Sequence, residues 1–213
     1  MDERGIVLIG DVVDSRLDLA AASDWSRRLS AELTALAPDD QLAPFDFTQG
    51  DEVQGLVRWS ADPFRFVLQG LLHDTAPRMR WVIVAGSIER GQGSATRRTG
   101  QAYVAARTLV GEAKQRHDAL LAVSGGAAAD VLLDDLAPVL AASLTAMTPR
   151  QRTIARLMLL EGCRQADVAA RLGISRATVS VAYGRGRVRD ASRLLAAVRR
   201  IFETGLAQAG GAA

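Results

Sequence analysis

The chain has few residues of several types, and each shortage excludes a class of protein. A single cysteine, Cys163, rules out an intrachain disulfide, which fits a reducing cytoplasm. No apolar run reaches the length of about 18 residues that a transmembrane helix needs. The apolar run after "MDERG" is too short for a signal peptide. We therefore expect a cytoplasmic protein with no membrane partner.

Signatures of metal and phosphate binding are also scarce. The two histidines, His73 and His117, have no Cys or His partner at metal-ligand spacing, so we expect ordinary surface or helix-end residues. The stretch "IERGQGSATRRTG" is rich in glycine and arginine. It matches neither a P-loop nor a dinucleotide fingerprint, because both require glycines at set spacings. It could approach a phosphate or be a mobile surface loop.

Positive charge is concentrated near the end of the chain. Residues 148–203 contain 12 arginines and no lysine against 4 acidic residues, which gives this segment a net charge of +8. The rest of the chain carries −6, so the overall charge is only +2. An acidic body with a basic C-terminal segment indicates two modules, the second with a polyanionic partner. A helical region with a solvated arginine face is the alternative.

The first part of the chain alternates between strand and helix patterns. Continuous apolar runs such as "GIVLIGD" are typical of strands buried on both faces. Trp25, Leu29 and Leu33 have helical spacing, and Asp62 with Pro63 begins another helix. The expected order is β-α-β-β-α-β-α-β, and its first six elements form the split βαβ arrangement of ferredoxin-like folds. We expect an α+β, ferredoxin-like domain with a four- or five-stranded sheet and helices on one face.

The composition changes along the chain predict four regions. The ferredoxin-like domain covers residues 1–125, and an all-α helix-turn-helix domain covers residues 148–203. Between them, residues 126–147 form a helical linker with one short helix. The small residues at 204–213 predict a flexible tail.

Two aspartates are expected at adjacent strand ends. Asp11 follows the first apolar strand, and Asp51 lies in the Gly-Asp turn of the predicted hairpin. Because unpaired carboxylates repel each other, a divalent cation would relieve the conflict, and Mg²⁺ prefers one or two carboxylates with water and phosphate oxygens. We therefore expect Asp11 and Asp51 to bind Mg²⁺, with Asp14 supporting the turn. Asp14 and Glu52 lie close by in sequence and could support these ligands or be ligands themselves. The alternative is that Asp11 and Asp14 are only strand-end and turn residues.

The stretch "ADVAARLGISRATVS" predicts a helix-turn-helix, which follows a helix that begins at Thr148 and ends at Gly162. The small Ala169 lets two helices cross closely. Gly173 supplies a left-handed turn, and Ser175 caps the third helix. We expect that helix to continue through residue 189, weakened near its end by glycines.

The third helix would present its first residues to base edges in the major groove. Arg176 could read guanine and Thr178 a thymine methyl or a phosphate, whereas the later arginines suit phosphates. The expected DNA-binding residues are Arg176, Thr178, Ser180, Arg185 and Arg187. A helix-turn-helix used for protein contact is the alternative, but the charge of the segment favours double-stranded DNA.

Four motifs carry a resemblance to known families: "LIGDVVDSR", "FTQGDEVQGLV", "RWVIVAGSIERG" and "GQAYVAARTLVGEAK". In this order they resemble the SatD family over most of the chain. They are similar, more distantly, to class III nucleotidyl cyclases, in which one metal-binding aspartate ends the first strand and another lies in a Gly-Asp hairpin. That similarity implies these roles for Asp11 and Asp51. The C-terminal segment resembles region 4 of sigma factors.

The chain departs from the cyclases at two positions. Phe47 stands where they often carry a base-selecting lysine, and Tyr103 where they carry a transition-state asparagine. A site without donors for the developing charge loses most of its rate advantage, so the resemblance implies nucleotide binding more than cyclisation. The expected nucleotide-binding residues are Gly50, Arg90 and Arg107. Arg107 could instead form a local ion pair.

Together these features favour a DNA-binding transcriptional regulator whose N-terminal domain senses a nucleotide or metal without catalytic residues. A homodimer is expected because one helix-turn-helix reads few base pairs. The rival hypothesis is a Mg²⁺-dependent nucleotide-processing enzyme, cyclase- or nucleotidyltransferase-like, that its helix-turn-helix localises. A third is an assembly module with neither activity.

Overall fold

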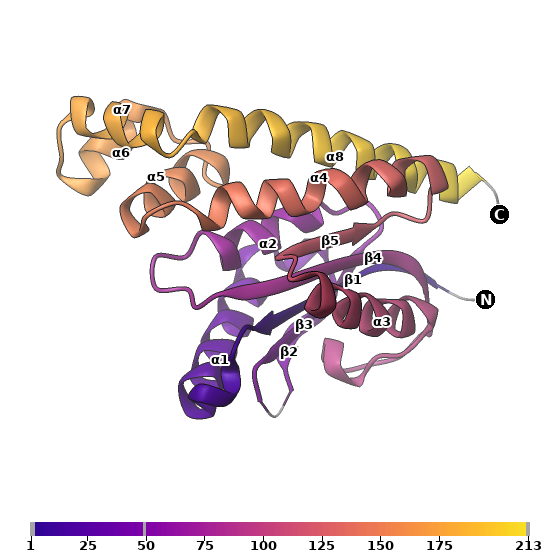
Figure 1. Cartoon of the computed structure of the whole chain (residues 1–213). Coiled ribbons are helices and arrows are strands. Elements are labelled where there is room, and N and C mark those ends of the chain that lie inside the picture. The colour runs from indigo at the N-terminus through magenta and orange to yellow at the C-terminus, as the bar shows by residue number, and fades with distance from the viewer. Residues whose placement is uncertain (1–2, 49, 212–213) are drawn as a thin grey trace.

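The computed structural model describes residues 3–48 and 50–211, which form a five-stranded sheet and eight α-helices (Figure 1). The strands are β1 (Glu3–Val12), β2 (Gln41–Phe47), β3 (Glu52–Arg58), β4 (Met79–Ile88) and β5 (Leu120–Val123). The helices are α1 (Leu19–Leu36), α2 (Pro63–Leu71), α3 (Gln101–Arg116), α4 (Ala127–Thr145), α5 (Pro149–Leu159), α6 (Gln165–Leu172), α7 (Arg176–Arg185) and α8 (Val188–Gly211). The α+β class and the expected order of elements up to β5 are confirmed.

The sheet has the order β2-β3-β1-β4-β5, with β1 at its centre. β1 pairs antiparallel with both β3 and β4, and β5 joins β4 in parallel. Along β1, Ile6 and Leu8 enter the core on one face, while Val7 and Ile9 enter the core on the other. All four are fully buried, so the continuous apolar run does mark a strand covered on both faces.

The helices cover both faces of the sheet, so the expectation of helices on one face is wrong. Helices α1, α2, α4 and α8 bury one face. Helix α3 packs on the other, through a stripe that includes Ala102, Ala106 and Val110. Both faces of β1 and β4 are apolar, and each apolar face requires its own layer of covering helices.

Helices α4 and α8 lie side by side along the sheet and are longer than expected (Figure 1). Instead of a short linker helix and a flexible tail, α4 has 19 residues and α8 has 24. Leu133 and Leu140 of α4 and Leu195 and Phe202 of α8 are buried in the main core. Despite these lengths, no helix in the described ranges is long and apolar enough to cross a membrane.

The end of α8 is docked where β5 turns into α4. A Cβ atom at Gly205 would lie 1.9 Å from Oγ of Ser124, and one at Gly126 would lie 2.7 Å from Cα of Gly205. Ser124 is itself fixed, because its Oγ donates a hydrogen bond of 2.6 Å to Oδ1 of Asp130. The small residues near the C-terminus therefore permit close helix packing. The flexible tail that their composition predicts at 204–213 is instead the end of α8 up to Gly211.

The predicted third helix of the helix-turn-helix is divided in two. Helix α7 ends at Arg185, and α8 begins at Val188. Between them Arg187 has a left-handed φ of 50°. This break turns the chain so that α8 runs back along α4, which a continuous helix through residue 189 could not do.

Replacing Gly205 by alanine tests the docking of α8. We expect the free energy of unfolding to fall by about 1–3 kcal/mol, because the new methyl group overpacks a close contact. The matched control is Gly111→Ala in α3, where a Cβ would meet nothing within 4 Å. That change should raise stability by up to about 1 kcal/mol, since alanine favours helix. Equal stabilisation by both changes in urea unfolding would contradict the docked α8.

Candidate DNA-binding surface and carboxylate site

Helices α5, α6 and α7 have the caps that the sequence predicted. Oγ1 of Thr148 accepts a hydrogen bond from the backbone N–H of Gln151, whose Oε1 accepts one from the N–H of Thr148. Gly173 ends α6 with a left-handed φ of 63°. Oγ of Ser175 accepts a 3.1 Å hydrogen bond from the N–H of Thr178 at the start of α7. These local contacts fix where each helix begins and ends.

The three helices enclose a small core of their own. Its buried members are Ile154, Leu157, Val168, Ala169 and Val179. Cys163 and Ile174 are half-buried against this core, which confirms that the cysteine is a small packed residue. The angle between α6 and α7 therefore depends on packing as well as on the Gly173 turn.

The outward surface of α7 carries most of the expected DNA-binding residues. Arg176, Ser180 and Arg185 are exposed. Thr178 is half-buried, and its hydroxyl lies 2.9 Å from Oγ of Ser175, so it takes part in the helix cap. Arg187 is exposed but lies beyond the end of α7, where it forms an ion pair of 3.0 Å with Asp190.

Val181 is a surface residue of α7 that the sequence reasoning missed. Its side chain is 54% exposed. It follows Ala177 by one turn and precedes Gly184 by three residues, so these residues share one helix face. Val181 also borders a groove between α7 and the first turn of α5, where Arg150 lies. The spacing of four and three residues between Ala177, Val181 and Gly184 could have revealed this face from the sequence.

The helix-turn-helix is joined to the α/β domain by packing and by polar contacts. Ala155 of α5 is buried in the main core, and Tyr183 of α7 packs against it. A guanidinium N–H of Arg152 donates a 3.4 Å hydrogen bond to the carbonyl oxygen of His73, which follows α2. On α8, Arg199 forms a 2.6 Å ion pair with Asp62, the N-cap of α2. The helix-turn-helix thus has a small core of its own and is joined to the main core through Ala155 and Tyr183.

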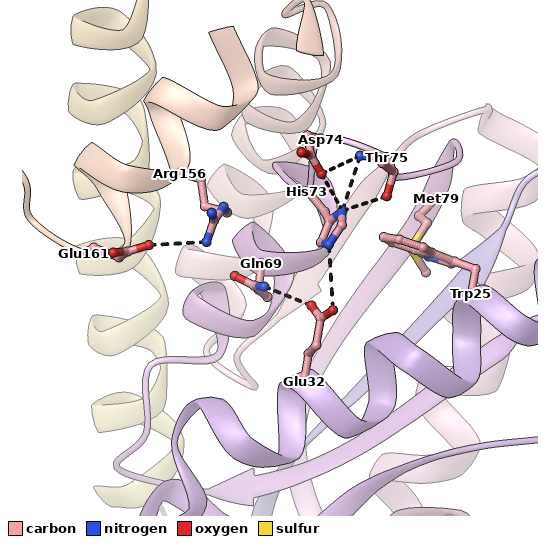
Figure 2. A network of polar contacts seen from close by, with 9 residues as sticks. All are labelled: Trp25, Glu32, Gln69, His73, Asp74, Thr75, Met79, Arg156 and Glu161. Carbon is pink, nitrogen blue, oxygen red and sulfur yellow. Dashed lines mark hydrogen bonds and ion pairs between the residues drawn. The ribbon is translucent and has the colours of Figure 1, made fainter. Parts of the chain in front are cut away.

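Polar side chains form a network near this junction (Figure 2). Glu32 of α1 accepts a 3.1 Å hydrogen bond from Gln69 of α2 and lies 3.7 Å from Nε2 of His73. On α5, Arg156 pairs at 3.3 Å with Glu161, which also pairs with an arginine of α6. His73 thus contacts α1 through its side chain and α5 through its carbonyl oxygen.

The carboxylates at the end of β1 form a row across the sheet. In the strand register Asp11 lies between Glu52 of β3 and Arg80 of β4. Asp11 is buried, and its two oxygens accept hydrogen bonds from Arg80 at 2.9 Å and from Lys114 of α3 at 3.0 Å. Glu52 pairs with Arg107 of α3 and accepts a 2.7 Å hydrogen bond from Gln54. Two cations from α3 and one from β4 thus neutralise this row.

Asp51 lies where the sequence predicted it, beside Asp11. Its backbone oxygen accepts a 3.1 Å hydrogen bond from the N–H of Val12, and both aspartates line one depression. The chain's own cations, however, already relieve the charge conflict that suggested a metal. Within residues 3–48 and 50–211, no three His, Cys, Asp or Glu side chains are arranged to hold a metal ion. Magnesium binding stays a prediction, and it requires the displacement of Lys114 from Asp11.

The other expected ligand-binding residues are separated from one another. Gly50 is next to Asp51, and Arg107 lies near them in its ion pair with Glu52, the second of its two expected roles. Arg90, by contrast, follows the far end of β4, because Ile88 pairs with Glu3 at the start of β1. The length of β1 therefore separates Arg90 from Asp11. Asp14 lies in the turn after β1 with a left-handed φ of 59°, and its side chain forms no cap hydrogen bond there.

The glycine-rich loop between β4 and α3 is fixed to the sheet edge. Oδ2 of Asp46 in β2 accepts hydrogen bonds of 2.6 Å from Ser94 and 2.7 Å from Thr96. Burial opposes ionisation, but these bonds outweigh it and hold the pKa of Asp46 below its ordinary value. Tyr103 donates a 3.0 Å hydrogen bond to the carbonyl of Ala95. The tyrosine at the cyclase asparagine position therefore holds the loop in place.

The two cations on Asp11 should contribute unequally to stability. The side chain of Arg80 is 13% exposed and that of Lys114 is 50% exposed. Arg80→Ala should cost about 3–5 kcal/mol of unfolding free energy, because it leaves a buried carboxylate short of a partner. Lys114→Ala should cost at most about 1 kcal/mol, as for an exposed pair. Adding Asp11→Asn to Arg80→Ala should recover part of the loss. Equal costs for the two single variants in urea unfolding would be inconsistent with this network.

Comparison with known proteins bears on the C-terminal part of the chain. Residues 139–189, from the middle of α4 to the start of α8, match the family model "Sigma-70, region 4". No curated protein and no solved structure matches the chain. The resemblances of the α/β part to the SatD family and to cyclases therefore stay predictions. The match, the caps and the exposed face of α7 together support a DNA-binding helix-turn-helix in this chain.

Proposed function

We propose that this protein is a transcriptional regulator that places α7 in the major groove of double-stranded DNA. The sigma-70 region 4 match over the helix-turn-helix carries this proposal. It is supported by the net charge of +8 in residues 148–203, because neutralising phosphates releases counterions from DNA. A helix-turn-helix used only for protein contact has no need of this charge.

The shape of α7 suits close approach to base edges. Ala177, Ser180 and Gly184 have small side chains or none, so the backbone of α7 can enter the groove deeply. Arg176, in the first turn, is placed to bond the O6 and N7 acceptors of guanine. Arg185 at the end of α7 and Arg150 at the start of α5 border the groove beside this face, where phosphate contacts would fix the register.

We propose further that the α/β domain, a ferredoxin-like and cyclase-like module, biases DNA binding in response to a nucleotide, with Mg²⁺ as an expected partner. The strand order β2-β3-β1-β4 and the meeting of Asp11 and Asp51 at one depression support this idea. Phe47 and Tyr103 argue against turnover, and Tyr103 is committed to the loop at Ala95. A homodimer is part of the proposal, because paired half-sites lengthen the sequence that is read.

Fluorescence anisotropy with labelled duplexes tests the DNA proposal. The target is the DNA upstream of the protein's own gene, and a scrambled duplex of the same length is the reference. Arg176→Ala should weaken binding to the target by about 1–3 kcal/mol and leave the scrambled duplex nearly unaffected, since base contacts supply specificity. The matched control is Arg28→Ala, an exposed arginine of α1, which should change the Kd less than about twofold.

Salt dependence provides the second measurement. Binding to both duplexes should weaken steeply as salt rises, in proportion to the number of phosphates contacted. If Arg176→Ala and Arg28→Ala weaken binding equally, and if target and scrambled duplex bind alike, then α7 does not read bases. The regulator proposal would then fail.

A further inference from the structure

A second cavity lies beside the carboxylate depression, between β4, the end of α3 and α4. Its volume is about 480 Å³, and it shares Asp14, Arg80 and Lys114 with that depression. Small-molecule pockets usually occupy about 300–1,000 Å³, so it is large enough for a compact ligand. None of its remaining lining residues is among the expected metal, nucleotide or DNA ligands.

The cavity contains cationic and N–H donor groups that the fold does not use. Arg78 precedes β4, and His117 caps the end of α3 with a left-handed φ of 59°. Within the described part of the chain, neither side chain forms an ion pair or hydrogen bond, and both are exposed. Lys114 pairs with Asp11 but is half-exposed, so its ammonium group can also reach an occupant. Three donors thus converge on one space.

Two carboxylates line the same cavity, beside the cations Arg78, Arg80 and Lys114. Asp118 forms a 2.7 Å ion pair with Arg116, a guanidinium that it shares with Asp134. Asp14 lies at the exposed rim that the cavity shares with the carboxylate depression. The lining therefore favours an anion with several oxygen atoms, because arginine offers a planar fork of donors that suits phosphate.

The remaining wall of the cavity belongs to α4. Pro138, Ala142 and Thr145 line it, spaced four and three residues apart on one face of the helix. The C-terminal end of α4 is only three residues from Thr148, which caps the first helix of the helix-turn-helix. An occupant would therefore touch both the sheet edge and the helix that supports the DNA-binding module.

We propose that this cavity binds a phosphate-bearing anion through Arg78, His117 and Lys114, and that its occupancy shifts the position of α4 relative to the sheet. A ligand changes DNA affinity only if it binds the DNA-competent arrangement differently from the alternative. The cavity can supply such a difference in affinity, because its donors lie on the sheet side and its other wall is α4, which leads to α5. A ligand would bind differently when α4 lies nearer to or farther from these donors. The binding site stands independently of the proposed function, whereas its effect on DNA rests on that function.

Isothermal titration of the full chain with tripolyphosphate and with ATP tests the site, with sulfate at matched ionic strength as the reference. Arg78→Ala should weaken binding at least about tenfold, as expected for loss of a charge-assisted contact. The matched control is Arg28→Ala, an exposed arginine of α1 that lines neither the cavity nor the neighbouring depression, and it should change the Kd less than about twofold. Ala142→Leu keeps every charge but fills the cavity, and it should also abolish binding.

The outcomes separate the site from its regulatory role. Similar affinity for tripolyphosphate and ATP would identify the phosphates as the recognised group. Much tighter binding of ATP would show that the cavity also contacts the nucleoside. No saturable binding, equal losses for Arg78→Ala and Arg28→Ala, or normal binding by folded Ala142→Leu would overturn the site. If binding follows the prediction but DNA affinity does not change with ligand, the site stands and the proposed sensing fails.

Discussion

The packing of α4 against α8 over one face of the sheet is the contact on which the rest of the structure depends. The two helices precede and follow the helix-turn-helix, and both bury leucines in the core of the α/β domain. The DNA-binding module is therefore held at both ends, unlike a domain on a flexible linker. Close contact at Gly205 and Gly126 fixes the far ends of this pair. Any displacement of α4 relative to the sheet is consequently transmitted to α5.

Charge is arranged differently at the two ends of this assembly. At the end of β1, Asp11 and Glu52 form ion pairs with Arg80, Lys114 and Arg107 from within the chain. The surface of α7 instead presents arginines without such internal neutralisation, which suits an external polyanion. The neighbouring cavity combines both features, because it adjoins the satisfied carboxylates and contains donors that remain unused. This contrast explains why one basic surface is proposed to meet DNA and the other a small anion.

Local sequence signals predicted the strands and the helix caps well. Thr148, Gly173 and Ser175 act through their nearest neighbours, so their roles can be read without knowledge of the fold. The pairing of Asp11 with Arg80 and Lys114 joins residues 69 and 103 positions apart, and no spacing rule reveals it. For this reason the sequence indicated a metal at Asp11 but not the two cations of the chain that pair with this carboxylate.

The long-range docking of α8 was missed for a related reason. A run of glycine and alanine is typical of a flexible end, and only the close approach of Ser124 to Gly205 turns it into a packing surface. The position of α3 on the opposite face likewise depends on both faces of β1 being apolar. The apolar run of β1 implies a helix layer on each face, which the expectation of helices on one face did not include. The position of Arg90 depended on strand direction, which places the end of β4 away from Asp11.

Because α4 and α8 join the two modules, the whole chain should unfold as one cooperative body. The chain offers a direct test, because its three tryptophans, at positions 25, 59 and 81, lie in the α/β part, and its one cysteine, Cys163, lies in the helix-turn-helix. Urea unfolding should be followed by tryptophan fluorescence and, on the same samples, by pulsed thiol labelling of Cys163. We expect both probes to report the same midpoint. Exposure of Cys163 at clearly lower urea than the fluorescence transition would show that the helix-turn-helix unfolds independently of the α/β part.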